Sequence, residues 1–568
     1  MFTLKKILAE KILEGIFSFA PDSGLDAEAV AGMLEYPPDA SMGDIALPCF
    51  KLSKALRKAP AQIAEAIAPF LRLDCLAKAE TAGGYLNMTV SDAYLSSGVL
   101  SRVLTEGEKY GAPDFGKGKT VVLDYSSPNV AKPFHIGHLG TTVIGHSLKK
   151  LHEFAGYKCI GINYLGDWGT QFGKLIVAYR KWGSREIVEN GGVDKLVELY
   201  VRFHAEAEKD ASLEDEARAE FAKLEKGDEE NLKLWRWFVD ISLAEYKQTY
   251  RLLGIEFDSY KGESFYTDKM PEQVEILREK GLLKIDDGAS IVDLSEYKMP
   301  PCLILKRDGS TLYPTRDIAA AVYRKKEYNF DKAIYVTSAG QCLHFAQWFK
   351  VVELMGYDWY DELVHVPYGT VSINGSKLAT RTGNVILLRD LFALAIDKVS
   401  DIIEEKNPGL ENKKQVAEDV GVGAIVFYYL SNNRMRDINF VMEDALSFDG
   451  NTGPYVQYTY ARTCSILSKA SPAKGEDCIT CDEERTLIKT FARFEEKVVD
   501  AIAEYEPSII TRYILDVAVA FNQFYHNCQI LGAEDERVRN TRLRLVKAAQ
   551  TVLGNAFGLI CLKKTEKI

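Results

Sequence analysis

Residues 120–164 read TVVLDYSSPNVAKPFHIGHLGTTVIGHSLKKLHEFAGYKCIGINY, and this stretch decides the fold. The mostly apolar run at 120–124 has β-branched residues without polar alternation, which is typical of a buried strand in a parallel sheet. Residues 126–134 form a loop, apolar residues recur at helical spacing over 136–155, and 158–164 is a second strand. The order strand, loop, helix, strand predicts the opening of a doubly wound nucleotide-binding fold.

The loop becomes the helix at His135, Ile136, Gly137 and His138. A helix amino terminus carries partial positive charge and offers backbone N–H groups, so we expect a phosphate there beside the two imidazoles. Gly137 has no side chain, which would let a nucleotide approach closely. Two histidines three residues apart can instead bind a metal ion, but zinc needs further ligands that do not occur nearby. Two purely structural histidines are the remaining alternative.

The whole chain predicts three domains. Residues 1–112 form an amino-terminal α+β domain. Residues 113–400 form an α/β Rossmann-like core, interrupted by a charge-rich helical insertion at about 183–252 whose charges suit a solvated helix face. Residues 401–568 have helical periodicity and predict a carboxy-terminal all-α bundle.

Further strands are expected in two of these domains. The amino-terminal domain has the strand-like segment AGGYLNMTV at 82–90. In the core, strands at 333–337 and 364–373 lie on either side of a helix at 345–355, which continues the alternation of a doubly wound sheet.

The composition is that of a globular protein, with 568 residues, 47% hydrophobic and 27% charged. No apolar run is long enough to span a bilayer, and the amino-terminal amphipathic helix lacks the features of a signal or transit peptide, so we expect a cytoplasmic protein. Ten cysteines are scattered; the close pair Cys478 and Cys481 could begin a zinc site but has no second pair, and no metal site is expected. The net charge of −11 disfavours indiscriminate nucleic-acid binding but permits a specific RNA partner.

Five segments in order resemble arginyl-tRNA synthetases, a family of class I aminoacyl-tRNA synthetases. They are SSPNVAKPFHIGHLGTTVIG, NYLGDWGTQFGKL, LYPTRDIAAA, QCLH at 341–344 and FDGNTGPYVQYTYAR. In this family the tetrapeptide at 135–138 is the HIGH signature. The resemblance runs nearly end to end, and it implies a tRNA-elbow-binding amino-terminal domain, a class I catalytic core and a helical anticodon-binding domain.

The resemblance also implies the reaction. L-Arginine and ATP, with Mg²⁺, would form arginyl-adenylate and pyrophosphate, and the 2′-hydroxyl of tRNA(Arg) would then take the arginyl group and release AMP. No covalent enzyme intermediate and no tightly bound cofactor are needed, so catalysis would consist of positioning and electrostatic stabilisation. Arginine activation is expected to require bound tRNA, and the enzyme is expected to be a monomer.

A guanidinium pocket needs carboxylates, because a planar fork of N–H donors is best matched by charged oxygen acceptors. The resemblance implies that Glu263 and Asp317 supply them, with Tyr313 one helical turn before Asp317. It also implies that Asn129 and Gln341 hold the backbone end of the amino acid. The structural alternatives are surface acids, core packing, a turn former and a loop residue.

The second class I signature, KMSKS, corresponds here to KLATR at 377–381. Lys377 matches the first lysine, but Thr380 replaces the second, a departure that resembles the KMSTRKGN-like variants of arginyl-tRNA synthetases. Another cation should then stabilise the pyrophosphate. The resemblance implies Lys132, three residues before His135; a solvent-exposed lysine is the alternative.

The remaining residues that the resemblance implies bind ATP or tRNA. For ATP they are His135, Gly137, His138, His344 and Lys377, although His344 could instead brace its loop. For tRNA they are Tyr85 and Asn87, at a D-loop base. Tyr458 and Tyr460 could stack on anticodon bases, although core packing fits one of them equally well.

Two other functions remain open. A small-molecule nucleotidyltransferase shares the HIGH signature, but the long helical carboxy-terminal region counts against it. An inactive RNA-binding relative would not need to keep both histidines and both acids. Trp168 and Gln171 are expected to be architectural, because an aromatic residue flanked by glycine after a strand usually packs at the end of a sheet.

Overall fold

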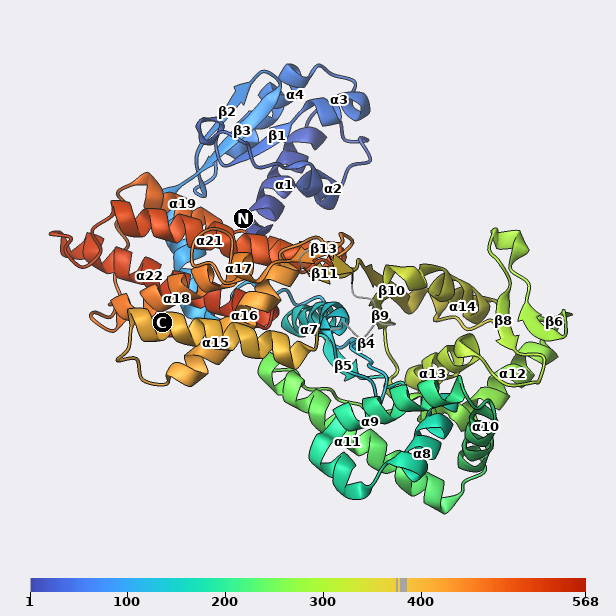
Figure 1. The fold of residues 1–568 in the computed structure, drawn as a ribbon. Coiled ribbons are helices and arrows are strands. Elements are labelled where there is room, and N and C mark those ends of the chain that lie inside the picture. Colours follow the sequence, from blue (N-terminus) through green and yellow to red (C-terminus); the bar gives the residue numbers. More distant parts are fainter. Residues whose placement is uncertain (1, 374–375, 378–385) are drawn as a thin grey trace.

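The computed structural model describes residues 2–373, 376–377 and 386–568. Figure 1 shows the amino-terminal residues as a unit of their own, next to a bundle of carboxy-terminal helices, with the central sheet and its helical additions on the other side. Within the described part of the chain, no helix combines the length and the apolarity needed to cross a membrane.

The amino-terminal unit is an antiparallel sheet covered by helices. Its strands lie in the order β1-β3-β2. In β3, Leu86 and Met88 are buried while Tyr85 and Asn87 lie on the other face. The sequence predicted β3 but not β2, because β2 reads LAKAETA, in which Thr81 is the one β-branched residue and Ala, Lys and Glu are depleted in strands. The elements are α1 (Phe2–Phe17), α2 (Ala27–Met33), β1 (Ile45–Pro48), α3 (Phe50–Leu56), α4 (Pro60–Ile67), β2 (Leu76–Ala82) and β3 (Tyr85–Val90).

The sheet of the central core is parallel, with the order β10-β9-β4-β5. Val121 and Leu123 of β4 pack in the cluster that contains α7, whereas Val122 packs with residues of α13 and α14 on the opposite face. Both faces are therefore covered by helices, which confirms the predicted doubly wound sheet. Its elements are β4 (Thr120–Asp124), α7 (Leu139–Phe154), β5 (Lys158–Ile162), α13 (Tyr313–Tyr328), β9 (Lys332–Ser338), α14 (Cys342–Leu354) and β10 (Leu363–Tyr368).

The strand predicted at 364–373 is wrong as a single element. It is two strands in different sheets, β10 and β11 (Val371–Ile373), separated at Gly369. The N–H of Gly369 donates to the carbonyl of Arg434, and β11 pairs with β13 (Ile438–Phe440) and with β12 (Ser376–Lys377). The partners of β11 lie elsewhere in the sequence, so a continuous apolar run did not reveal the break.

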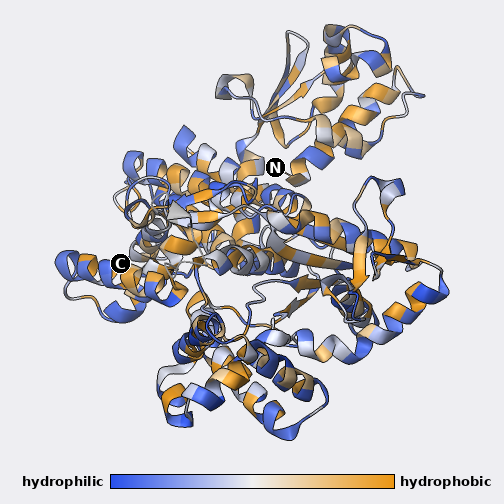
Figure 2. Cartoon of the chain, turned by 45° about the vertical axis from the view of Figure 1, so that its right-hand side comes forward, coloured by the Kyte–Doolittle hydropathy of each residue, from blue (hydrophilic) through white to orange (hydrophobic). Residues whose placement is uncertain are grey.

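Two additions extend the core. The helical one has its own apolar centre, which includes Phe172, Phe203 and Phe238, and its polar residues lie on the outside (Figure 2). It comprises α8 (Thr170–Trp182), α9 (Arg185–Ala207), α10 (Ser212–Glu225) and α11 (Glu229–Leu253). The other is an antiparallel sheet that follows α12 (Met270–Glu279) and comprises β6 (Leu283–Asp286), β7 (Ala289–Val292) and β8 (Cys302–Leu305).

Helices make up most of the carboxy-terminal part, and they pack directly on the core. The Ser147 hydroxyl of α7 donates to the carbonyl of Leu559, 2.7 Å away. The domain boundary expected near residue 400 falls inside α15. A position within a helix does not define where a domain ends, and that boundary stays a prediction. The elements include α15 (Leu388–Lys406), α16 (Lys413–Leu430), α18 (Gly453–Leu467), α19 (Asp482–Phe491), α20 (Phe494–Ala503), α21 (Ser508–Asn527) and α22 (Glu536–Leu559).

Candidate active site

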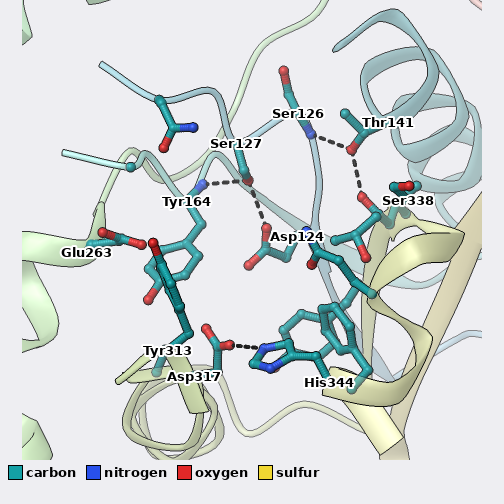
Figure 3. A pocket seen from close by; sticks show the side chains of 18 of the residues that line it. Asp124, Ser126, Ser127, Thr141, Tyr164, Glu263, Tyr313, Asp317, Ser338 and His344 are labelled. Carbon is teal, nitrogen blue, oxygen red and sulfur yellow. Dashed lines mark hydrogen bonds and ion pairs between the residues drawn. The ribbon is translucent and has the colours of Figure 1, made fainter. Parts of the chain in front are cut away.

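A cavity of about 490 Å³ opens at the carboxyl ends of β4, β5 and β9. This edge of a parallel sheet is where doubly wound folds bind ligands. Figure 3 shows polar side chains from separate segments converging on it. Of the residues singled out from the sequence, its lining contains Asn129, His138, Glu263, Tyr313, Asp317, Gln341 and His344.

The histidines of the first signature are tied to the backbone through one ring nitrogen each. Nδ1 of His135 accepts from the N–H of Gly137 at 3.0 Å, and Nδ1 of His138 accepts from the N–H of His135 at 3.2 Å. Burial lowers the pKa of His138 to about 3 and also lowers that of His135, so both rings are neutral near pH 7. In His135, whose Nδ1 accepts, a neutral ring carries its proton on Nε2, which leaves that N–H to donate to a ligand. Nδ1 of His138 also lies 3.3 Å from the carbonyl of His135, so the tautomer of His138 depends on which of these two backbone groups it bonds.

The backbone at this helix entry does not match the prediction. The N–H of Ile136 donates to the carbonyl of Ile386, and the N–H of Gly137 is used by His135. These donors are therefore not open to a phosphate, and the imidazoles remain. A Cβ on Gly137 would lie 2.7 Å from Cε1 of His135, so this glycine makes room for the imidazole ring.

Helix α11 stabilises the loop between β4 and α7 through hydrogen bonds. The Tyr246 hydroxyl donates to the carbonyls of Asn129 and Lys132, both at 2.8 Å, and the Tyr250 hydroxyl lies 2.8 Å from that of Ser126. The loop takes left-handed backbone angles at Ser126, with φ 70°, which such contacts must stabilise. One side of the last turns of the predicted insertion therefore packs on the core, while the charged Lys247 and Arg251 of the same turns are exposed.

The second signature follows β11, and the chain that leaves it returns to the first. The backbone of Lys377 lies in β12, opposite Ser372. Its side chain and residues 378–385, including Thr380, lie outside the described residues. Beyond them, the N–H of Leu388 donates to the carbonyl of Phe134 at 2.9 Å, so the chain that leaves the second signature is hydrogen-bonded to the first.

Two acids form one end of the cavity, and each already has a partner from this chain. Oε2 of Glu263 lies 2.9 Å from Nη1 of Arg316, and Oδ2 of Asp317 lies 2.7 Å from Nε2 of His344. Burial raises the pKa of Glu263 to about 7, against the lowering effect of Arg316. Tyr313 stands at the rim with 66% of its surface exposed (Figure 3).

The other candidates surround this cavity at different depths. Asn129 and Gln341 are both exposed lining residues. The side chain of Lys132 is exposed and is not part of the lining, but its charge contributes to the low pKa of His138. Lys132 is therefore close enough to the first signature for its charge to be felt there.

Sequence reasoning missed a buried ion pair in the wall of the cavity. Nη1 of Arg324 lies 2.7 Å from Oδ2 of Asp124, and the side chains are 1% and 9% exposed. The Ser127 hydroxyl donates to Oδ1 of Asp124 and accepts from the N–H of Tyr164. The pair thus joins β4, α13 and the loop after β5. The position of Asp124, a polar residue at the end of β4, could have indicated a functional role. No sequence pattern singled out Arg324, which lies 200 residues later.

The tRNA candidates fall into two places. Tyr85 and Asn87 lie two residues apart in β3, and the Tyr85 ring is 5.6 Å from that of the exposed Phe50. Tyr458 is 45% exposed, but Tyr460 is only 8% exposed and packs against Phe557. The packing alternative therefore applies to Tyr460, because a buried ring has no face open to a base.

The cysteine pair noted in the sequence is not the pair that the fold brings together. Sγ of Cys481 lies 3.3 Å from Sγ of Cys528, and Glu484 completes this group of potential metal ligands, which does not include Cys478. The Glu484 carboxylate already accepts from the backbone at Thr480 and from Nε of Arg542 at 2.7 Å. Helix packing between α19 and α21 explains the proximity.

A parallel sheet that presents HIGH at its first helix entry and joins it to a second signature segment defines a class I aminoacyl-tRNA synthetase. Residues 99–442 match the family of class I (R) tRNA synthetase catalytic domains. Residues 456–568 match the DALR anticodon binding domain, and residues 3–90 match the arginyl tRNA synthetase N terminal domain. The chain belongs to the arginyl-tRNA synthetase family.

Individual relatives agree over the full length. Arginine–tRNA ligase of Alkaliphilus metalliredigens (strain QYMF) is 52% identical over 550 residues, which cover 96% of this chain and 97% of that protein. Arginine–tRNA ligase of Clostridium perfringens (strain 13 / Type A) is 50% identical and covers 99% and 100%. The solved structure of Thermus thermophilus arginyl-tRNA synthetase superposes with a TM-score of 0.82 at 25% identity, covering 98% and 99%.

Proposed function

We infer that the chain ligates L-arginine to tRNA(Arg) at the expense of ATP. The arginine carboxylate attacks the α-phosphorus of ATP, forming arginyl-adenylate and releasing pyrophosphate. A terminal hydroxyl of the tRNA then takes the arginyl group and AMP leaves. The observation that carries this inference is the single cavity that joins His138 of the HIGH signature to the acids Glu263 and Asp317.

The acidic end suits the guanidinium of arginine. Glu263 and Asp317 are both largely buried, with side chains 15% and 21% exposed, so their charges require a cation. Tyr313 at the rim can cover the guanidinium once it has entered. Asn129 and Gln341 also line the cavity, where they can hold the amino and carboxylate groups. A substrate without a fork of donors leaves acceptors unpaired here.

The opposite end suits the ATP phosphates. The Nε2–H groups of His135 and His138 can stabilise negative charge that develops at the α-phosphate, and neutral rings do so without titrating near pH 7. Lys132 and Lys377 supply positive charge to the pyrophosphate, and Gly137 admits the His135 ring. Mg²⁺ bound to ATP would supply further positive charge at the phosphates.

His344 is proposed to act at both the guanidinium end and the nucleotide end of the cavity. Its ring lines the cavity and bonds Asp317, so a nucleotide contact and the orientation of Asp317 are compatible roles. Tyr85 and Asn87 are proposed to meet the tRNA elbow. Tyr458 is proposed to meet an anticodon base, with the Arg462 guanidinium 5.2 Å from its ring centre. We further propose a cytoplasmic monomer.

Pyrophosphate exchange tests the function directly. Exchange is measured with each amino acid, with and without bulk tRNA. We expect exchange with arginine alone, and only when tRNA is present. Exchange with a substrate other than an amino acid would favour a small-molecule nucleotidyltransferase, and tRNA binding without any exchange would indicate an inactive relative.

A further inference from the structure

One acid of the proposed guanidinium pocket, Glu263, is already paired with a guanidinium from the protein itself. Arg316 lies in the first turn of α13, next to Asp317, and its Nη1 reaches Oε2 of Glu263 at 2.9 Å. The two side chains are only 13% and 15% exposed, so this is not a solvated surface pair. Sequence reasoning assigned Glu263 to the substrate and gave Arg316 no role.

Arg316 does not use all of its hydrogen-bond donors in this ion pair. Nε of Arg316 is buried and has no hydrogen-bond partner among the described residues. A structural arginine–carboxylate pair typically uses two parallel N–H···O bonds. Here the closest contact joins Nη1 of Arg316 to Oε2 of Glu263, and Oε1 of Glu263 is the atom that can meet a second guanidinium.

We propose that Arg316 is a built-in counter-ion that keeps Glu263 ionised in the empty pocket and leaves Oε1 for the guanidinium of the substrate. Arg316 is then a positioning residue that determines specificity, since an ionised Glu263 demands a cation. This inference rests on the proposed role of Glu263 in arginine binding.

The surroundings of Glu263 explain why a counter-ion is needed. The charged groups that face it are Arg316 and Asp317 on α13 and Asp167 after β5, and the Tyr164 ring faces the same acids. Burial is the largest effect that raises the pKa of Glu263, and Asp317 and Asp167 raise it further. Arg316 opposes all three effects. Without it, the pKa of Glu263 rises above about 7, and a protonated carboxyl would become an O–H donor that faces the donors of the substrate.

The test is the pH dependence of arginine binding, measured as a dissociation constant by equilibrium dialysis between pH 6 and 9. In the wild type, binding should weaken as the pH falls through about 7, because a cation binds the ionised form of Glu263. In Arg316→Gln the inflection should move to higher pH, with binding at pH 7 about fivefold weaker for the first unit of movement and about tenfold weaker for each further unit. Discrimination against the neutral analogue citrulline should shrink in the same variant.

Three further variants separate the possible outcomes. Arg316→Lys keeps the charge and should keep the wild-type inflection. Arg278→Gln is a matched control, because Arg278 is exposed on α12 and pairs within that helix. Arg316→Met retains the apolar stem and replaces Arg316→Gln if that variant does not fold, as judged by its melting temperature.

The variants distinguish a failure of the counter-ion inference from a failure of the proposed guanidinium site. If Arg316→Gln keeps the wild-type inflection while Glu263→Gln binds arginine weakly, the counter-ion inference is overturned and the pocket stands. If Glu263→Gln binds arginine like the wild type, the proposed guanidinium site itself is overturned.

Discussion

Asp317→Asn removes one charge from the guanidinium pocket with almost no change in volume. Asp317 is 21% exposed and its Oδ2 lies 2.7 Å from Nε2 of His344. An asparagine oxygen can still meet that ring, so the helix and the His344 contact should survive. The amide, however, cannot neutralise a guanidinium, and the N–H donors of its NH₂ group would face the N–H donors of the guanidinium.

The size of the effect follows from the burial of this carboxylate. Removing one partner of a buried, hydrogen-bonded charge pair costs about 2–5 kcal/mol. Because Asp317 is partly exposed, solvent screening favours the lower half of this range. Each 1.4 kcal/mol is tenfold, so we expect arginine binding to weaken roughly 30- to 300-fold.

Aminoacylation kinetics at saturating ATP and tRNA provide the assay. The KM for arginine should rise, the KM for ATP should stay within about twofold, and the melting temperature should be close to that of the wild type. The preference for arginine over lysine should also decrease, because the pocket has lost one of the two carboxylates that match the planar guanidinium better than the compact ammonium group of lysine. A variant that melts earlier yet keeps the wild-type KM for arginine would falsify the pocket and leave Asp317 as a helix-stabilising residue.

Other parts of the molecule give further predictions. His138→Asn should slow adenylate formation by about 2–4 kcal/mol in activation free energy, and because the pKa of His138 is about 3, the wild-type rate should show no inflection from this ring between pH 5 and 9. Lys132→Ala should slow arginine-dependent pyrophosphate exchange without changing the dissociation constant of arginine; an unchanged exchange rate would remove its role. Arg324→Met should lower the free energy of unfolding in urea by about 3–5 kcal/mol, because it leaves the Asp124 carboxylate buried without its cation. Tyr458→Ala should weaken tRNA binding by about 1–3 kcal/mol in a filter assay, and unchanged affinity would exclude base stacking there.

The amino-acid sequence by itself determined the class of fold. The mostly apolar run at 120–124 indicated a strand buried on both faces, and both faces are indeed covered. The HIGH tetrapeptide marked the helix entry because strand, loop and helix are local patterns. Five separate segments in a fixed order then indicated the arginyl-tRNA synthetase family, and comparison with relatives confirms this.

Only the tertiary structure decided how the site is built, because its contacts join residues that are distant in the sequence. Arg324 is 200 residues from Asp124, and Arg316 is 53 residues from Glu263. No periodicity links such pairs, since each side chain obeys the pattern of its own helix or strand. The strand at 364–373 was divided for the same reason: two different sheets supply its partners. Local spacing fixes the elements, whereas burial and charge pairing between elements fix which side chains meet.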